Sequence, residues 1–153
     1  MAKLRELRDL YQDMILEHNK NPRNFRSLPQ ANRKAEGYNP LCGDHFTVYL
    51  RLENNALKDI SFEGSGCAIS KASASMMTAS LQGKTKVEAQ ELFERFHRLV
   101  TRRATEAHDG ADVGKLVVFS GVSEFPVRVK CATLAWHTML AALEEKTETV
   151  STE

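Results

Sequence analysis

Three single cysteines and one aspartate are the residues of this sequence best suited to chemistry. Cys42 stands where an alternating segment begins, and Asp44 follows two residues later, so both side chains fall on the same side of an extended backbone. Cys67 and Cys131 each occur at or near the predicted start of a helix, where free backbone N–H groups lower the pKa of a thiol. Three thiolates and one carboxylate would complete a tetrahedral shell for a soft metal ion, zinc or iron.

Each of these residues also has a purely structural interpretation. Cys67 or Cys131 alone could pack in a hydrophobic core, because free cysteine is among the residues most often buried. Asp44 alone could cap a helix or stabilise a turn. A cysteine hydrolase would need a histidine beside one thiol and an oxyanion hole, and the sequence singles out none of its 5 histidines.

A predicted hairpin brings two of the thiols together. Apolar residues alternate with polar ones over residues 45–52 and again over 58–63, and Asn54-Asn55 forms a short turn between them. The open ends of two strands joined by a short turn lie side by side. We therefore expect Cys42, before the first strand, to be a near neighbour of Cys67, after the second.

Helices are predicted around this hairpin. Residues 3–18 and 87–100 carry apolar side chains at helical spacing, and residues 67–81 form a helix rich in small residues. Pro126 suits the first turn of a last helix, because its missing N–H costs nothing there. The buried stripe of that helix is predicted to be Ala132, Trp136, Met139 and Leu143.

The remaining segments carry weaker signals. The polar stretch up to Pro40 is predicted to be a loop or an irregular edge strand. The charged stretch 101–112 is interpreted as a solvated surface, and the polar tail from Lys146 as frayed.

Composition narrows the class of protein. The chain has 153 residues, of which 42% are hydrophobic and 27% charged, and its formal net charge is +1, too small for a field that attracts nucleic acid or a membrane surface. It contains neither an apolar run of about 20 residues nor the apolar core of a signal peptide. We expect a single cytoplasmic domain over residues 1–153, with no nucleic-acid or membrane partner.

Four stretches together resemble the signatures of the U-type iron–sulfur cluster assembly proteins, the IscU and NifU N-terminal family. They are residues 15–24, residues 39–44 around the first cysteine, residues 64–77 around the second and residues 130–136 around the third. The resemblance covers residues 4–145, and the ordered set is specific although Cys-Gly-Asp alone would be weak.

Two features resemble the SufU branch of that family. Lys130 stands where the scaffold proteins IscU and NifU carry a histidine directly before the last cysteine. The segment from Lys86 to Val113 is similar to the insertion of SufU proteins, and so is the sequence Arg-Val-Lys-Cys at residues 128–131.

The resemblance implies an α+β fold, with a small antiparallel β-sheet of about three strands and α-helices packed on one face. It implies Zn²⁺ bound by Cys42, Asp44, Cys67 and Cys131. It also implies a pyridoxal-phosphate-dependent cysteine desulfurase of the SufS type as partner, with downstream iron–sulfur assembly proteins. The implied activity is zinc-dependent sulfur transfer, in which a histidine of the partner displaces one zinc ligand and Cys42 takes up the outer sulfur as a persulfide.

Arg128 is a candidate for stabilising the thiolate or persulfide of Cys42, or else a surface residue in an ion pair.

The implied protein is a sulfurtransferase that works with its donor rather than a stand-alone enzyme. One rival is a scaffold on which a [2Fe–2S] cluster is assembled on the same residues, since iron also accepts thiolate ligands. Another is a non-catalytic, zinc-stabilised binding module.

Overall fold

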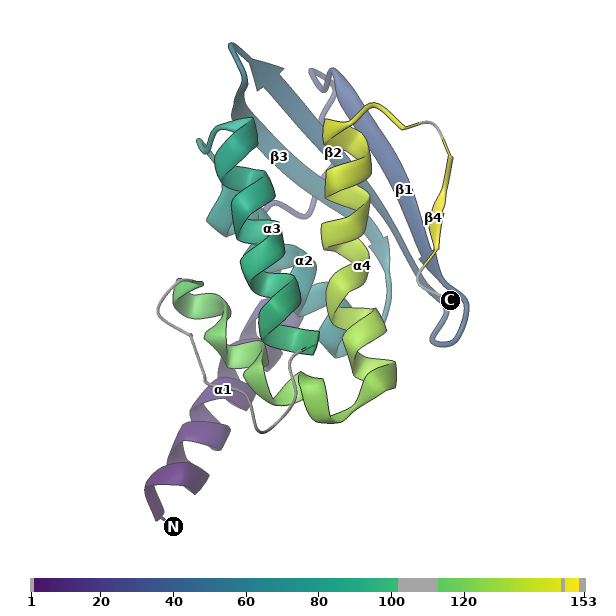
Figure 1. Cartoon of the computed structure of the whole chain (residues 1–153). Coiled ribbons are helices and arrows are strands. Elements are labelled where there is room, and N and C mark those ends of the chain that lie inside the picture. Colours follow the sequence, from purple (N-terminus) through teal and green to yellow (C-terminus); the bar gives the residue numbers. More distant parts are fainter. Residues whose placement is uncertain (1, 102–112, 147, 152–153) are drawn as a thin grey trace.

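The computed structural model describes residues 2–101, 113–146 and 148–151, without the side chains of residues 2–5 (Figure 1). The elements follow one another as α1 (Ala2–Lys20), β1 (Arg33–Asn39), β2 (Asp44–Glu53), β3 (Ala56–Ser65), α2 (Ala68–Leu81), α3 (Lys86–Thr101), the 3₁₀ helix η2 (Gly114–Glu124), α4 (Pro126–Leu143) and β4 (Val150–Ser151). The charged stretch 102–112 lies outside the described residues. Within the described part, no helix is long and apolar enough to span a membrane.

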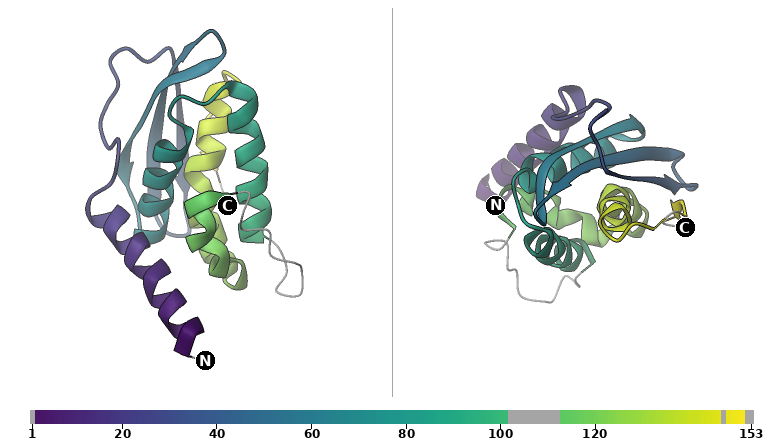
Figure 2. Two further views of the ribbon diagram at one scale, coloured as in Figure 1. Left: turned by 90° about the vertical axis from the view of Figure 1, so that its left-hand side faces the viewer. Right: turned by 90° about the horizontal axis from the view of Figure 1, so that it is seen from above.

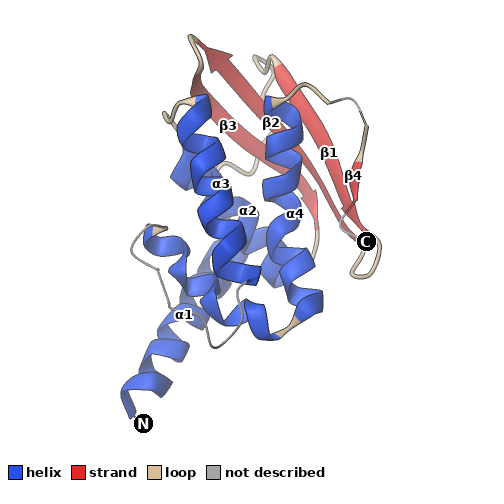
Figure 3. Ribbon diagram, in the orientation of Figure 1, coloured by secondary structure: helices blue, strands red, loops and turns tan. Residues whose placement is uncertain are grey.

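The strands form one sheet in the order β3-β2-β1-β4 (Figure 3). The three long strands are antiparallel neighbours, which confirms the predicted α+β fold with its small antiparallel sheet. Residues 150 and 151 add a short fourth strand that pairs in parallel with Gly37 and Tyr38 of β1. The C-terminal tail, which we expected to fray, therefore contributes to the sheet, and the sheet as a whole is mixed.

β1 is a regular strand between β2 and β4, although we predicted a loop or an irregular edge strand. Its buried positions are Ala35, Gly37 and Asn39, so the large apolar residues that reveal a half-buried strand are missing. α4 packs so closely here that a Cβ on Gly37 would overlap the Oγ1 of Thr138. The buried face of β1 is filled by the close approach of α4 instead of by large apolar side chains of β1. The apolar alternation that predicts a strand is therefore absent from its sequence.

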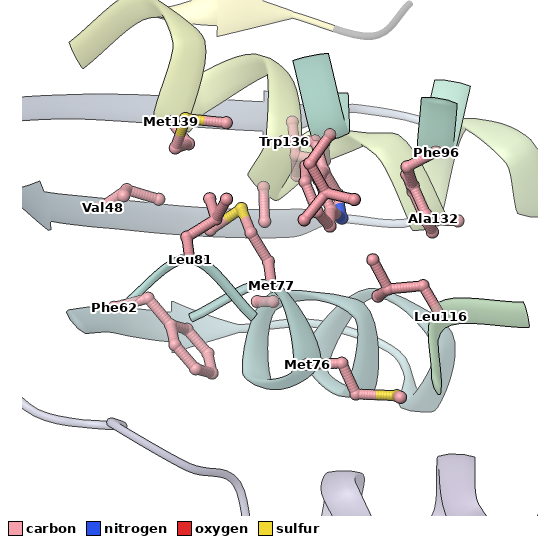
Figure 4. Close-up of a cluster of buried hydrophobic side chains, with 14 of the residues drawn as sticks. Val48, Phe62, Met76, Met77, Leu81, Phe96, Leu116, Ala132, Trp136 and Met139 are labelled. Carbon is pink, nitrogen blue, oxygen red and sulfur yellow. The ribbon is translucent and has the colours of Figure 1, made fainter. Parts of the chain in front are cut away.

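The helices cover one face of the sheet. α2 and α4 lie against it, and α3 packs beyond them on α4 and η2 (Figure 2). The predicted buried stripe of α4 is confirmed, since all four of its residues are buried. The Trp136 ring stacks on Phe96 of α3 with centroids 4.6 Å apart (Figure 4). The Trp136 Nε1 donates to Ser73 Oγ of α2 at 3.2 Å. These contacts join three helices above the sheet.

Candidate metal centre

The first candidate residue, Cys42, lies in the tight turn between β1 and β2. The backbone N–H groups of Cys42 and Gly43 both donate to the carbonyl oxygen of Asn39, at 3.3 and 2.8 Å. Gly43 has a φ of 72°, a left-handed conformation that glycine adopts without a steric penalty. The turn leaves Cys42 exposed, whereas Cys67 is half-buried and Cys131 is buried.

Asp44 begins β2 and is completely buried. Its Oδ1 accepts the backbone N–H of Cys67 at 2.9 Å, and its Oδ2 accepts the side-chain amide of Asn39 at 3.3 Å. His45, the next residue, is exposed on the opposite face, as strand alternation predicts. Both donors to Asp44 are neutral, and no ion pair among the described residues includes its carboxylate.

Cys67 is the N-cap residue of α2, which confirms its predicted position at the start of a helix. Its Sγ accepts the backbone N–H of Ser70 at 3.4 Å. The Cys131 thiol is the largest influence that lowers the pKa of Cys67, to about 6, and hydrogen bonds from Ser70 act in the same direction against the cost of burial. Cys67 is therefore the thiol of this pair that ionises first.

Cys131 occupies the second turn of α4, because the helix begins at Pro126. The prediction that free N–H groups at a helix start favour its thiolate is wrong, since those groups belong to the first four residues of a helix. Interaction with Cys67, then burial and Cys42, raise the pKa of Cys131 instead. The Cys131 Sγ donates a hydrogen bond to the Cys42 Sγ at 3.2 Å.

The structure brings three of the four predicted ligand residues into one cluster. One ligand atom each from Cys42, Asp44 and Cys131 lie within 4.8 Å of one another, the single such group among the described residues. The Cys67 Sγ is not part of that group; it accepts the backbone N–H of Ser70 as a helix cap and also interacts with the Cys131 thiol. Its backbone N–H nevertheless bonds to Asp44, so Cys67 borders the cluster through Asp44, whereas the predicted proximity of Cys67 to Cys42 itself stays a prediction.

The donor set fits a zinc or iron ion. Sulfur and oxygen ligands at about 2.0–2.3 Å in a tetrahedral shell lie roughly 3.6–3.8 Å apart. The three donors here lie within 4.8 Å of one another, so small side-chain movements would bring them to one ion. A buried carboxylate without a cationic partner also carries a desolvation cost that a metal ion would offset. Thiolates favour zinc or iron over calcium or magnesium.

Arg128 lies at the exposed start of α4, and its guanidinium carbon sits 4.5 Å from the centroid of the Phe125 ring. Among the described residues no hydrogen bond or ion pair links it to a thiol. Its role toward Cys42 stays a prediction.

No histidine joins the thiol cluster within the described part of the chain. His18 bonds to Ser75 Oγ at 2.7 Å, and His137 packs against Phe93 and His97. His108 lies outside the described residues. The arrangement therefore gives no support to a cysteine hydrolase, which needs a histidine next to its thiol.

Two residues of the site escaped the sequence reasoning. Asn39 is completely buried and donates to both Asp44 and Cys131. Gly66 lies so close to the carboxylate that a Cβ there would stand 2.7 Å from Asp44 Oδ1. Both residues fall inside the motifs that carry the family resemblance, but neither has a side chain that suggests chemistry by itself.

Comparison with known proteins identifies relatives along nearly the whole chain. A family model described as NifU-like N terminal domain matches residues 10–145. The zinc-dependent sulfurtransferase SufU of Bacillus subtilis is 38% identical over 130 residues, which cover 85% of this chain and 86% of that protein. The iron–sulfur cluster assembly scaffold protein IscU of Streptococcus pyogenes is 35% identical over 141 residues, covering 92% of this chain and 87% of that protein.

Solved structures share the fold. A SUF-system iron–sulfur cluster assembly scaffold protein from Fervidobacterium islandicum aligns with a TM-score of 0.79 at 34% identity, over 86% of this chain and 94% of that one. The N-terminal part of a nitrogen-fixing NifU-like protein from Brucella abortus aligns with a TM-score of 0.77 at 25% identity, over 91% and 97% of the two chains.

Proposed function

Because this chain belongs to the NifU-like N-terminal domain family of iron–sulfur cluster assembly proteins, we propose that it accepts persulfide sulfur on Cys42 from a cysteine desulfurase. The observation that carries the proposal is the unequal exposure of the three thiols. Cys42 is exposed at the tip of a turn, while Cys131 is buried directly behind it. Cys42 is the most exposed of the three thiols, so a donor cysteine on another protein can approach it without unfolding part of the sheet or α4.

The sulfur step is a simple displacement. The Cys42 thiolate attacks the outer sulfur of the donor's cysteine persulfide, and a new S–S bond forms on Cys42. The S–S bond of the donor breaks, and the donor cysteine leaves as a thiolate. No external oxidant or reductant is needed, because one S–S bond replaces another.

Cys42, Asp44, Cys67 and Cys131 are the residues that would hold the metal, zinc in the transferase and iron or a [2Fe–2S] cluster in a scaffold. When bound, zinc supplies the positive charge that favours the thiolate forms of its ligands. Asp44 anchors the first turn of α2 through the Cys67 N–H, and the Gly43 turn presents Cys42 to solvent. Arg128, exposed and outside any ion pair among the described residues, would stabilise the charge of the Cys42 thiolate or persulfide.

Two features favour transfer over a scaffold function. Lys130 precedes Cys131, so the chain lacks a histidine as a fifth potential ligand at that position. α3 occupies the start of the SufU-like insertion, and its Phe96 packs on Trp136 of α4. The scaffold stays the second candidate, because relatives named IscU scaffold proteins are similar to this chain at nearly the same identity.

The test is persulfide transfer with metal analysis on the same sample. The protein, purified without added iron, is incubated with a SufS-type cysteine desulfurase and cysteine, and intact mass followed by peptide mapping locates any added sulfur. We expect about one zinc per chain and one additional sulfur on Cys42. Cys42→Ser should abolish the addition, whereas His45→Ala, a change at an exposed neighbour, should preserve it.

Other outcomes would select a rival function. An iron-bearing, coloured protein that takes no sulfur but passes a cluster to an apo-acceptor would support the scaffold. A zinc protein that accepts no sulfur, and in which Cys42→Ser lowers only stability, would support a non-catalytic binding module.

A further inference from the structure

A single buried side chain, that of Asn39, touches two of the proposed metal ligands. Asn39 is the last residue of β1 and has 0% of its surface exposed. Its Nδ2 donates to Asp44 Oδ2 at 3.3 Å and to Cys131 Sγ at 3.5 Å. These two ligands come from β2 and α4, which are far apart in the sequence, and one amide group spans them.

The same residue also shapes the turn that carries Cys42. The Asn39 carbonyl oxygen accepts the N–H groups of Cys42 and Gly43, and its side-chain Oδ1 accepts the N–H of Leu41 at 3.3 Å. Both ends of the amide are thus used, one to close the turn and the other to hold the donors behind it. A side chain with this bonding has little freedom to rotate.

The ligands are consequently held to different degrees. Asp44 and Cys131 are held by the Asn39 amide, and Cys67 is held by Ser70 as a helix cap. The Cys42 thiol is exposed. Among the described residues its one hydrogen bond comes from the Cys131 thiol, and neither Asn39 nor Ser70 bonds to it. Of the four donors, Cys42 is therefore the one that can leave with the least disruption of hydrogen bonds.

We infer that Asn39 is a positioning residue that keeps Asp44 and Cys131 in place as permanent ligands, so that Cys42 is the thiol that is released. This inference rests on the proposed metal site, but not on sulfur transfer. The effect of the amide is selective, because its Nδ2 bonds to the thiol of Cys131 and makes no hydrogen bond to the thiol of Cys42. Without the amide, the protein should still bind metal weakly. The Cys131 thiol should then react with an alkylating reagent at a rate closer to that of Cys42.

The test compares Asn39→Asp and Asn39→Ala with the wild type. Asn39→Asp keeps the volume and the acceptor that caps Leu41, but it replaces the amide donor with a second carboxylate facing Asp44. Asn32→Ala is the matched control, because Asn32 also makes two side-chain hydrogen bonds, to the backbone of Leu52, beyond the other end of β1. Far-UV circular dichroism establishes that each variant is folded.

Three quantities are measured: zinc affinity by competition with a chelator, the absorption spectrum of the Co²⁺-substituted protein, and the alkylation rates of Cys42 and Cys131 with and without zinc. We expect both Asn39 variants to lose about 10–100-fold in zinc affinity, the usual cost of removing a group that orients a metal ligand. The Co²⁺ spectrum should shift, because the ligands are held differently. The ratio of the alkylation rate of Cys42 to that of Cys131 should fall, because Cys131 has lost its hydrogen bond from Asn39. Asn32→Ala should match the wild type in all three.

Folded Asn39 variants with wild-type affinity, spectrum and alkylation preference would overturn the inference. If Asn39→Ala does not fold, Asn39→Asp alone decides the outcome, and the alkylation preference of the zinc-free protein decides it even if zinc binding is weak. A wild type that shows the expected alkylation pattern but accepts no sulfur would contradict the proposed transfer while leaving the role of Asn39 intact.

Discussion

The backbone N–H of Cys67 donates a hydrogen bond to Oδ1 of Asp44 at 2.9 Å, and this bond ties the N-cap of α2 to the first residue of β2. The open end of the hairpin and the first turn of a helix are thereby joined through a buried carboxylate. Neither can move away without leaving Asp44 short of a donor, which costs about 1–3 kcal/mol for a buried polar group.

Replacing Asp44 with alanine should separate a ligand role from a structural one. If Asp44 is a ligand, Asp44→Ala lowers zinc affinity at least about tenfold, so the rise in thermal midpoint on adding zinc shrinks. Differential scanning calorimetry with and without zinc measures this rise. Glu53→Ala, in a surface ion pair, should keep the full zinc response. If Asp44→Ala lowers the thermal midpoint by the same amount with and without zinc, Asp44 stabilises the fold but is not a zinc ligand.

Gly66 should tolerate no side chain. A Cβ there would lie 2.7 Å from Asp44 Oδ1 and 2.9 Å from Phe46 Cζ, so Gly66→Ala should destabilise the metal-free protein by about 1–3 kcal/mol. Urea unfolding measures the change. Gly121→Ala, whose Cβ would meet nothing within 4 Å, should be neutral or stabilise by about 0.4–1 kcal/mol. A Gly66→Ala variant as stable as Gly121→Ala would contradict the predicted steric conflict.

His18 should make the protein less stable in acid. Burial lowers the pKa of His18 below its ordinary value of 6.5, and Arg23 and Lys115 add to this while Glu17 opposes it. The unfolded chain then binds more protons than the folded one below pH 6.5, so stability that is present above this pH is lost as the pH falls through the folded pKa.

The free energy of unfolding, measured by urea titration at pH values above and below 6.5, tests this dependence. His18→Gln should lose less stability on acidification than the wild type. His45→Gln, a change at an exposed position, is the control and should follow the wild type. Parallel curves for His18→Gln and the wild type would rule His18 out as a source of the acid sensitivity.

Phe96 should be a main anchor of α3. It is fully buried and stacked on Trp136, so Phe96→Ala should cost about 3–5 kcal/mol of unfolding free energy. Val87→Ala, on the exposed side of the same helix, should change stability by less than about 0.5 kcal/mol. If Phe96→Ala unfolds at the same urea concentration as the wild type, α3 is not held by this contact.

The sequence was sufficient for the parts of the site that depend on short-range geometry. Strand alternation places Asp44 inward and His45 outward, and the short turn at Asn54-Asn55 brings the Cys67 segment to Asp44. These relations follow from a period of two residues and from antiparallel pairing, which local sequence specifies.

The parts that were missed depend on contacts between distant segments. β1 was hidden because Gly37 and Asn39 replace apolar residues at its buried positions, and only the approach of α4 explains both. The start of α4 at Pro126 was predicted correctly, but Cys131 lies five residues beyond it, outside the four N-terminal residues whose N–H groups are free. η2 has mixed apolar and polar residues without a helical period, so no element was predicted there.

The contact between Cys42 and Cys131 spans 89 positions of the chain, whereas Asp44 and Cys67 are only 23 apart. During synthesis from the N-terminus, the hairpin and the start of α2 are complete long before Cys131 is made. The contact of Cys131 with Cys42 closes a longer loop than the contact of Cys67 with Asp44, and it therefore has the larger entropic cost. The proposed set of four donors would thus be complete only in a chain whose last helix has docked, and metal uptake would report that docking.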